Sequence, residues 1–149
     1  MSLSYDVFTA AFLSKISEYD FFNMDEEIRT DVVDGFMKRA VAEFRKNCKY
    51  DLFSTADDEE RCFNQTIADE DLDEIVDIIS EGMLVQWMKP FLYNQENLEQ
   101  QLNTRDFTIY SPAELLMRIG NAHATARKNY INMVREYSYN HGNLKELHL

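Results

Sequence analysis

The stretch Asp69–Pro90, DEDLDEIVDIISEGMLVQWMKP, decides how the rest of the chain must pack. In its first half, apolar residues recur at helical spacing and acidic residues fill the positions between them, which predicts a helix with one buried and one wet face. The second half, from Met83 to Met88, is apolar on almost every side, as is typical of a helix inside a bundle. Pro90 has no amide hydrogen and should end or bend this helix. We therefore expect a central helix around which the other helices are arranged.

Two helices are predicted before this central one. Apolar spacing indicates the first from about Tyr5 to about Tyr19. The second should begin after Asn23, whose side chain can accept from the first helical turn while Glu26 reaches back to complete a capping box. It should end near Asn47, where basic residues complement the helix dipole.

Two further helical segments are predicted after the central helix. Residues 91–102 should continue it beyond a kink at Pro90. The strongest local signal in the chain is Ser111-Pro112-Ala113-Glu114, in which serine caps the helix, proline takes its first position and glutamate completes the box. An apolar seam of about seven turns follows. It includes Gly120, Ala122 and Ala126, which would let a neighbouring helix approach closely.

Gly35 lies inside the second predicted helix. Glycine in a helix interior lowers the stability of the helix by up to about 1 kcal/mol relative to alanine, so its presence there needs an explanation. A close crossing with another helix would explain it, and a functional hinge is the alternative.

Three segments have no helical period. Residues 48–68 form a long connection that should be either functional or mobile, with a short strand or an extended arm at 61–67. Residues 103–110 predict an extended loop, and 139–149 a C-terminal tail that begins where His141-Gly142-Asn143 stops the last helix. The expected fold is therefore all-α, a single-domain bundle of four to five helices with long extended loops and a C-terminal tail.

Composition supports one helical domain. The chain has 149 residues, of which 45% are hydrophobic, enough for a real core. Only four glycines and two prolines are present, which favours long helices over a many-stranded sandwich. Cys48 and Cys62 are the only cysteines, and without a recognisable signal peptide they are expected to be reduced thiols of a cytosolic protein. No apolar run approaches the roughly 20 residues of a membrane span.

Charge is distributed unevenly along the chain. The formal net charge is −12, and the stretch Asp51–Glu81 contains twelve acidic residues and a single basic one, Arg61. Such a chain should not bind nucleic acid through a general electrostatic footprint, and anionic lipid headgroups should repel it. The simplest interpretation of the acidic stretch is a solvated face, and an interaction surface is the alternative.

No motif predicts catalysis, a metal or a cofactor. Asp69, Asp71 and Asp73 alternate as in a calcium loop, but the position that should be glycine is Glu74 and the segment is helical. The three histidines lack the spacing of a zinc site, and the glycines are too scattered for a phosphate loop. We therefore predict a protein that is not an enzyme and that needs no cofactor.

The candidate functional residues are those of a binding or assembly protein. The first group is an acidic region that could face a channel or a neighbour: Asp57, Asp58, Glu59, Glu60, Asp71, Asp73, Glu74 and Asp77. The second is a basic face on the last helix: Arg118, Arg127, Lys128 and Arg135. The third consists of apolar anchors in the second loop: Phe107, Ile109 and Tyr110. Ordinary solvated arginines and loop side chains that pack on their own core are the simpler alternatives.

Three segments resemble the head–tail connector (adaptor or neck) proteins of tailed bacteriophages: EDLDEIVDIISEGMLVQWMKPFLY (70–93), NTRDFTIYSPAELL (103–116) and YINMVREYSYNHGNL (130–144). The resemblance implies a mostly helical subunit that assembles into a homo-oligomeric ring of about twelve copies below the portal protein. Such a ring extends the DNA channel without binding DNA specifically and offers a docking surface to the stopper or tail proteins. It implies a place in the neck of the virion, and in the host cytoplasm before assembly.

Two other functions stay open at this point. An acidic intracellular regulator could occupy the basic site of a nucleic-acid-binding partner, in which case it would form a tight, salt-sensitive complex and be absent from virions. An enzyme with a carboxylate site in the acidic region would show bound metal or perturbed carboxylate titration.

Overall fold

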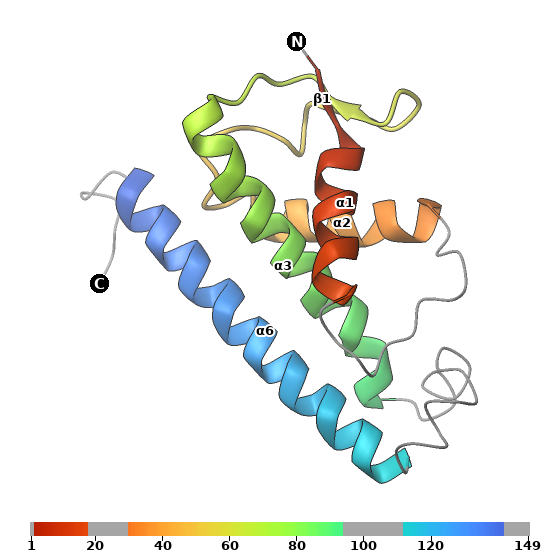
Figure 1. Cartoon of the computed structure of the whole chain (residues 1–149). Helices are drawn as coiled ribbons and strands as arrows, with labels where there is room; N and C mark the ends of the chain where they lie inside the picture. The colour runs from red at the N-terminus through yellow and green to blue at the C-terminus, as the bar shows by residue number, and fades with distance from the viewer. Residues whose placement is uncertain (1, 18–29, 94–111, 142–149) are drawn as a thin grey trace.

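Four helices and one very small sheet make up the structure, a computed structural model that describes residues 2–17, 30–93 and 112–141 (Figure 1). The helices are α1 (Tyr5–Ser17), α2 (Thr30–Phe44), α3 (Asp69–Tyr93) and α6 (Pro112–His141). The strands are β1 (Leu3–Ser4), β2 (Ala56–Asp57) and β3 (Cys62–Phe63). The predicted all-α class is confirmed.

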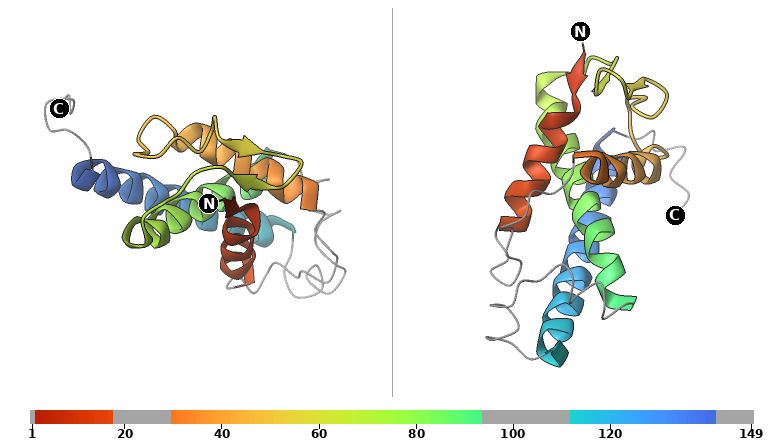
Figure 2. Two further views of the ribbon diagram at one scale, coloured as in Figure 1. Left: turned by 90° about the horizontal axis from the view of Figure 1, so that it is seen from above. Right: turned by 90° about the vertical axis from the view of Figure 1, so that its right-hand side faces the viewer.

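Helix α3 is the centre of the bundle. It packs against α1, α2 and α6, and α6 lies on the opposite side of α3 from α1 in both Figure 1 and Figure 2. Its buried face includes Ile75, Ile79 and Met83, all with no exposed area. Burial of each such side chain stabilises the fold by about 1.5–3 kcal/mol. The central role expected from the apolar pattern of Asp69–Pro90 is therefore confirmed.

Aromatic rings connect α1 to α3 and α2 to α6. The ring of Phe12 on α1 meets Trp87 on α3 edge-on, with centroids 6.1 Å apart. Phe44, the last residue of α2, meets Tyr137 on α6 in the same geometry at 5.1 Å. Edge-to-face pairs at these distances add about 0.5–1.5 kcal/mol beyond burial.

Small residues allow α3 to approach two neighbours closely. A Cβ atom on Gly82 would lie 3.1 Å from Cε2 of Tyr130 on α6 and 3.2 Å from Cβ of Ala40 on α2. On α6, Ala122 and Ala126 are buried as the sequence predicted. The glycine that the helix crossings require is therefore on α3.

Gly35 has open surroundings, with no atom within 4 Å of an added Cβ, so the close crossing expected there is wrong. We predict that Gly35→Ala raises the free energy of unfolding by up to about 1 kcal/mol, because alanine loses less backbone entropy in a helix. Chemical denaturation measures this directly. Gly82→Ala is the matched control, and it should destabilise the fold because Ala40 and Tyr130 would be crowded. Destabilisation by Gly35→Ala would indicate that the glycine is needed for its conformation.

The long connection 48–68 is held against the bundle. Its strands β2 and β3 form an antiparallel hairpin, and β1 completes a sheet of order β1-β3-β2, with Leu3 opposite Phe63. Phe63 is buried against Tyr5 and Phe8 of α1, at centroid distances of 4.8 and 5.5 Å. The strand predicted within 61–67 is confirmed, while the sheet itself depends on the N-terminus, which has no strand pattern of its own.

Two predicted boundaries of the earlier helices need correction. Helix α3 passes through Pro90 and is described to Tyr93, so Pro90 does not end it, and the predicted continuation of the helix beyond Pro90 is confirmed for residues 91–93. Helix α2 ends at Phe44 rather than near Asn47, and a turn follows. The capping box at Asn23 lies outside the described residues.

At the other end of the chain, α6 begins at Pro112, the first helical position predicted. It continues to His141, so 139–141 belong to the helix rather than to a tail. Residues 94–102, 103–110 and 142–149 lie outside the part of the chain that the structure describes.

Candidate functional site

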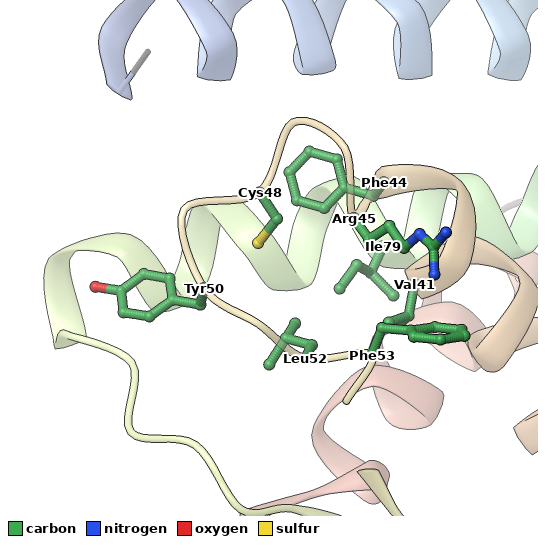
Figure 3. Close-up of a pocket in the computed structure, with 8 residues that line it drawn as sticks. All are labelled: Val41, Phe44, Arg45, Cys48, Tyr50, Leu52, Phe53 and Ile79. Carbon is green, nitrogen blue, oxygen red and sulfur yellow. The ribbon is translucent and has the colours of Figure 1, made fainter. Parts of the chain in front are cut away.

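Within the described residues, the structure shows no group of three or more His, Cys, Asp or Glu side chains that could hold a metal ion. The close-up in Figure 3 shows an apolar pocket between α2, α3 and the loop that follows α2. It is lined by Val41, Phe44, Arg45, Cys48, Tyr50, Leu52, Phe53 and Ile79. These side chains leave essentially no room for a water molecule. The pocket is therefore a closely packed contact between core side chains.

Within the described residues, no helix is long and apolar enough to cross a membrane.

Asp58, Asp71 and Asp77, among the eight predicted acidic residues, have cationic partners on their own chain. Asp58 accepts from Lys38 and from the Tyr5 hydroxyl, at 2.7 and 2.8 Å, and these hydrogen bonds lower the pKa of its carboxyl. Asp77 pairs with Lys15 at 2.7 Å. Asp58 therefore connects the hairpin to α1 and α2, and Asp77 connects α3 to α1.

Asp71 is the third, and it is not on a wet face as the periodicity predicted. It is 5% exposed, and it accepts a hydrogen bond from the Tyr50 hydroxyl at 2.7 Å, with the Lys49 ammonium 3.8 Å away. A buried carboxylate needs such partners, because desolvation of an unpaired charge is costly. The loop after α2 covers this part of α3, which spacing within α3 cannot show.

Glu81, near the middle of α3, is also buried and forms a 2.7 Å ion pair with Lys15 of α1. Burial alone would lower the pKa of Lys15, but its hydrogen bonds to Asp77 and Glu81 outweigh that effect, and the pKa is raised. Lys15 therefore joins α1 to α3 at an otherwise apolar interface.

The acidic surface that remains exposed is smaller than the sequence predicted. One part is the turn of the hairpin, residues Asp57–Glu60, here called the acidic turn, and another is the first turns of α3, where Asp69, Glu70 and Asp73 are exposed. Asp57 Oδ1 accepts from the backbone amides of Glu59 and Glu60, at 3.1 and 3.2 Å, and so shapes the turn. The side chains of Glu59 and Glu60 are exposed. Asp73, on the first turns of α3, is exposed, and Glu74 beside it is half-buried.

Arg61 fixes the acidic turn to the helices, a role that the sequence did not reveal. Its guanidinium donates to both carboxylate oxygens of Asp34 on α2, at 2.8 and 2.9 Å, and to Asp6 on α1 at 3.0 Å. Its backbone carbonyl accepts from the Tyr5 amide, and its φ of 51° is in the left-handed region. The one basic residue of the acidic stretch therefore connects the hairpin to α1 and α2.

The predicted basic residues of α6 do not form a single face. Arg118 and Arg127 are nine residues apart, about two and a half turns, so they project from opposite flanks of the helix. Arg118 lies 3.8 Å from Glu114, whereas Arg127, Lys128 and Arg135 are exposed. Lys128 and Arg135 share the outer side, away from α3. The predicted loop anchors Phe107, Ile109 and Tyr110 lie outside the described residues.

A second cationic feature lies at the C-terminal end of α2. It is an open depression of about 320 Å³, here called the cationic depression, lined by Arg45, Lys46, Cys48, Lys49, Tyr50, Asp51, Phe53 and Ser54. Arg45 stacks on the ring of Phe53, with its Cζ atom 4.6 Å from the centroid. The sequence indicated these cations only as complements to the helix dipole. Their arrangement around a concave surface depends on the turn that follows α2.

Comparison with protein-family models, with curated proteins and with solved structures finds no match for this chain.

Proposed function

We propose that this chain is a structural subunit of a tailed-phage virion, a head–tail connector that assembles into a ring below the portal. The observation that supports this most is the separation of charge on the subunit. The acidic turn is held by Tyr5 of α1 and Lys38 of α2, whereas Arg127, Lys128 and Arg135 are exposed on α6, which lies on the opposite side of α3 from α1. A ring made by head-to-tail contacts needs two different and complementary patches on each subunit.

In this role the subunit binds the portal protein on one side and a stopper or tail protein on the other. DNA passes through the ring without specific contacts, and the excess of acidic side chains on the chain repels phosphate. No cofactor is needed. The long, rigid α6 supplies an exposed helical surface that a partner can recognise without reorganisation of the core.

The test reverses the charge on α6. Arg127→Glu with Lys128→Glu should block joining of tails to portal-containing heads, because like charges across an interface cost several kcal/mol. The subunit should stay folded, since both side chains are exposed. Complementation of a phage that lacks this protein, followed by electron microscopy of the particles, measures the result. Arg127→Lys with Lys128→Arg is the matched control and should support normal joining. Normal tails on the reversed variant would contradict the role of α6.

A second candidate function, an acidic intracellular regulator, is favoured by the exposed carboxylates of the acidic turn. It requires a tight, salt-sensitive complex with a basic partner protein and the absence of the chain from virions. Mass spectrometry of purified virions therefore separates the two functions.

A further inference from the structure

The cationic depression and the acidic turn lie at different places along α2. The depression follows Phe44 at the C-terminal end, while the turn is fastened to Asp34 and to Lys38 near the middle of the helix, through the Arg61–Asp34 and Asp58–Lys38 contacts. Figure 2 shows the loop after α2 and the hairpin extending away from each other. One subunit thus presents opposite charge at two separate places along a single helix.

These two features cannot meet within one chain. Lys38, which holds the turn, and Phe44, after which the depression begins, are six residues apart, about 9 Å along the helix axis, whereas an ion pair needs contact within about 4 Å. Arg45 and Lys46 at the depression are exposed, and so are Glu59 and Glu60, whereas Lys49 pairs with Asp71 of its own chain at 3.8 Å. Charge complementarity is therefore available between subunits and is not used up inside one.

We propose that the cationic depression binds the acidic turn of a second copy of this chain, so that α2 carries both halves of one head-to-tail contact. The inference depends on the proposed self-assembly and assigns residues to it. Glu59 and Glu60 of one copy meet Arg45 and Lys46 of the next. Repetition of this contact places each subunit against two neighbours through two different surfaces, which closes a ring or extends a filament.

The shape and the charge of the depression favour a carboxylate-bearing turn over nucleic acid. Its cations are accompanied by Asp51 at the rim, which opposes the approach of a continuous run of phosphates. Glu59 and Glu60 of the short turn match two neighbouring basic side chains, while Asp58 is already paired with Lys38 and Asp57 accepts from the amides of the turn. The face of Phe53, 47% exposed, offers an apolar wall for the stems of the glutamates.

Two reciprocal charge reversals in the full-length chain test the contact. The first variant is Arg45→Glu with Lys46→Glu, and the second is Glu59→Lys with Glu60→Lys. Each alone should weaken self-association, measured by analytical ultracentrifugation at low salt, by about tenfold or more, because like charges then face each other. An equimolar mixture should recover association, since each reversed depression meets a reversed turn. Arg39→Glu, an exposed reversal between the two ends of α2, is the matched control and should associate like the wild type.

Other results overturn the inference in distinguishable ways. If either variant associates like the wild type, or the mixture does not recover, the contact is wrong while a ring built on other surfaces stands. A wild-type chain that stays monomeric at low salt and high concentration also overturns it, and its presence in virion necks then decides the proposed function separately. Binding of a short DNA duplex that Arg45→Glu with Lys46→Glu abolishes would identify a phosphate site instead. Circular dichroism establishes that each variant is folded.

Discussion

The chain is expected to unfold at alkaline pH, in a transition that begins just above pH 10. Three tyrosines are almost fully buried: Tyr5, Tyr130 and Tyr137 are 1%, 7% and 0% exposed. Burial raises the pKa of each phenol well above its ordinary value of 10.0, and nearby acidic groups add to this: the hydrogen bond and charge of Asp58 for Tyr5, and the charge of Glu43 for Tyr130.

The sign follows from proton binding. Above pH 10 the unfolded chain loses its phenol protons while the folded chain keeps them, so the folded state binds more protons and stability falls as pH rises. The stabilisation is fully present below pH 10. Each buried tyrosine contributes a loss of about 1.4 kcal/mol per pH unit above that value, so three of them remove about 4 kcal/mol by pH 11. A domain with a typical stability of about 5–15 kcal/mol then approaches its unfolding midpoint.

Ultraviolet absorbance of tyrosinate, recorded with circular dichroism during an alkaline titration, checks this prediction. Exposed phenols such as that of Tyr139 should ionise without unfolding, whereas the absorbance change from the buried phenols should coincide with the change in circular dichroism, because their ionisation requires unfolding. Tyr130→Phe should reduce the pH dependence by about a third, since one of the three linked groups is removed. Tyr139→Phe is the matched control: Tyr139 is 72% exposed, and its removal should leave the dependence unchanged. Free titration of all tyrosines in a folded chain would contradict the linkage.

The fold was predictable where local pattern and tertiary packing agree. The apolar second half of α3 predicted a central helix because no side of it could face water. Pro112 predicted the start of α6 because proline fits the first helical position, where its missing amide hydrogen is not needed. The buried face of α6 likewise followed from the spacing of residues such as Ala126 and Tyr137.

The candidate surfaces were less predictable because they depend on contacts between distant segments. Periodicity placed Asp71 in water, yet the loop after α2 covers it and supplies Tyr50 as a partner. Gly35 suggested a helix crossing, but the crossing uses Gly82 instead. A helical period shows which side of a helix is apolar and not which other segment covers it.

Arg61 is the clearest example, and its removal is expected to destabilise the fold by about 2–3 kcal/mol, in the range for hydrogen bonds between charged groups. Arg61→Ala leaves the Asp34 carboxylate, with a side chain only 13% exposed, without its two donors. Arg61→Gly should cost about 1 kcal/mol less, because glycine relieves the left-handed backbone at this position. Chemical denaturation of both variants, of Asp34→Ala, and of Arg61→Ala with Asp34→Ala measures the coupling. Additive effects of the two alanines would contradict the ion pair as the source of stability.

The same variant separates two explanations of self-association. Arg61 is the only cation in the stretch Asp51–Glu81, so Arg61→Ala makes the surroundings of the acidic turn more negative. If charge alone directed the turn to the cationic depression of another copy, association should strengthen. If Arg61 holds the turn in its docking position through Asp6 and Asp34, association should weaken although the carboxylates of Glu59 and Glu60 are intact. We expect weaker association, because a released turn must be ordered again on binding. Ultracentrifugation below the unfolding temperature of the variant decides between them.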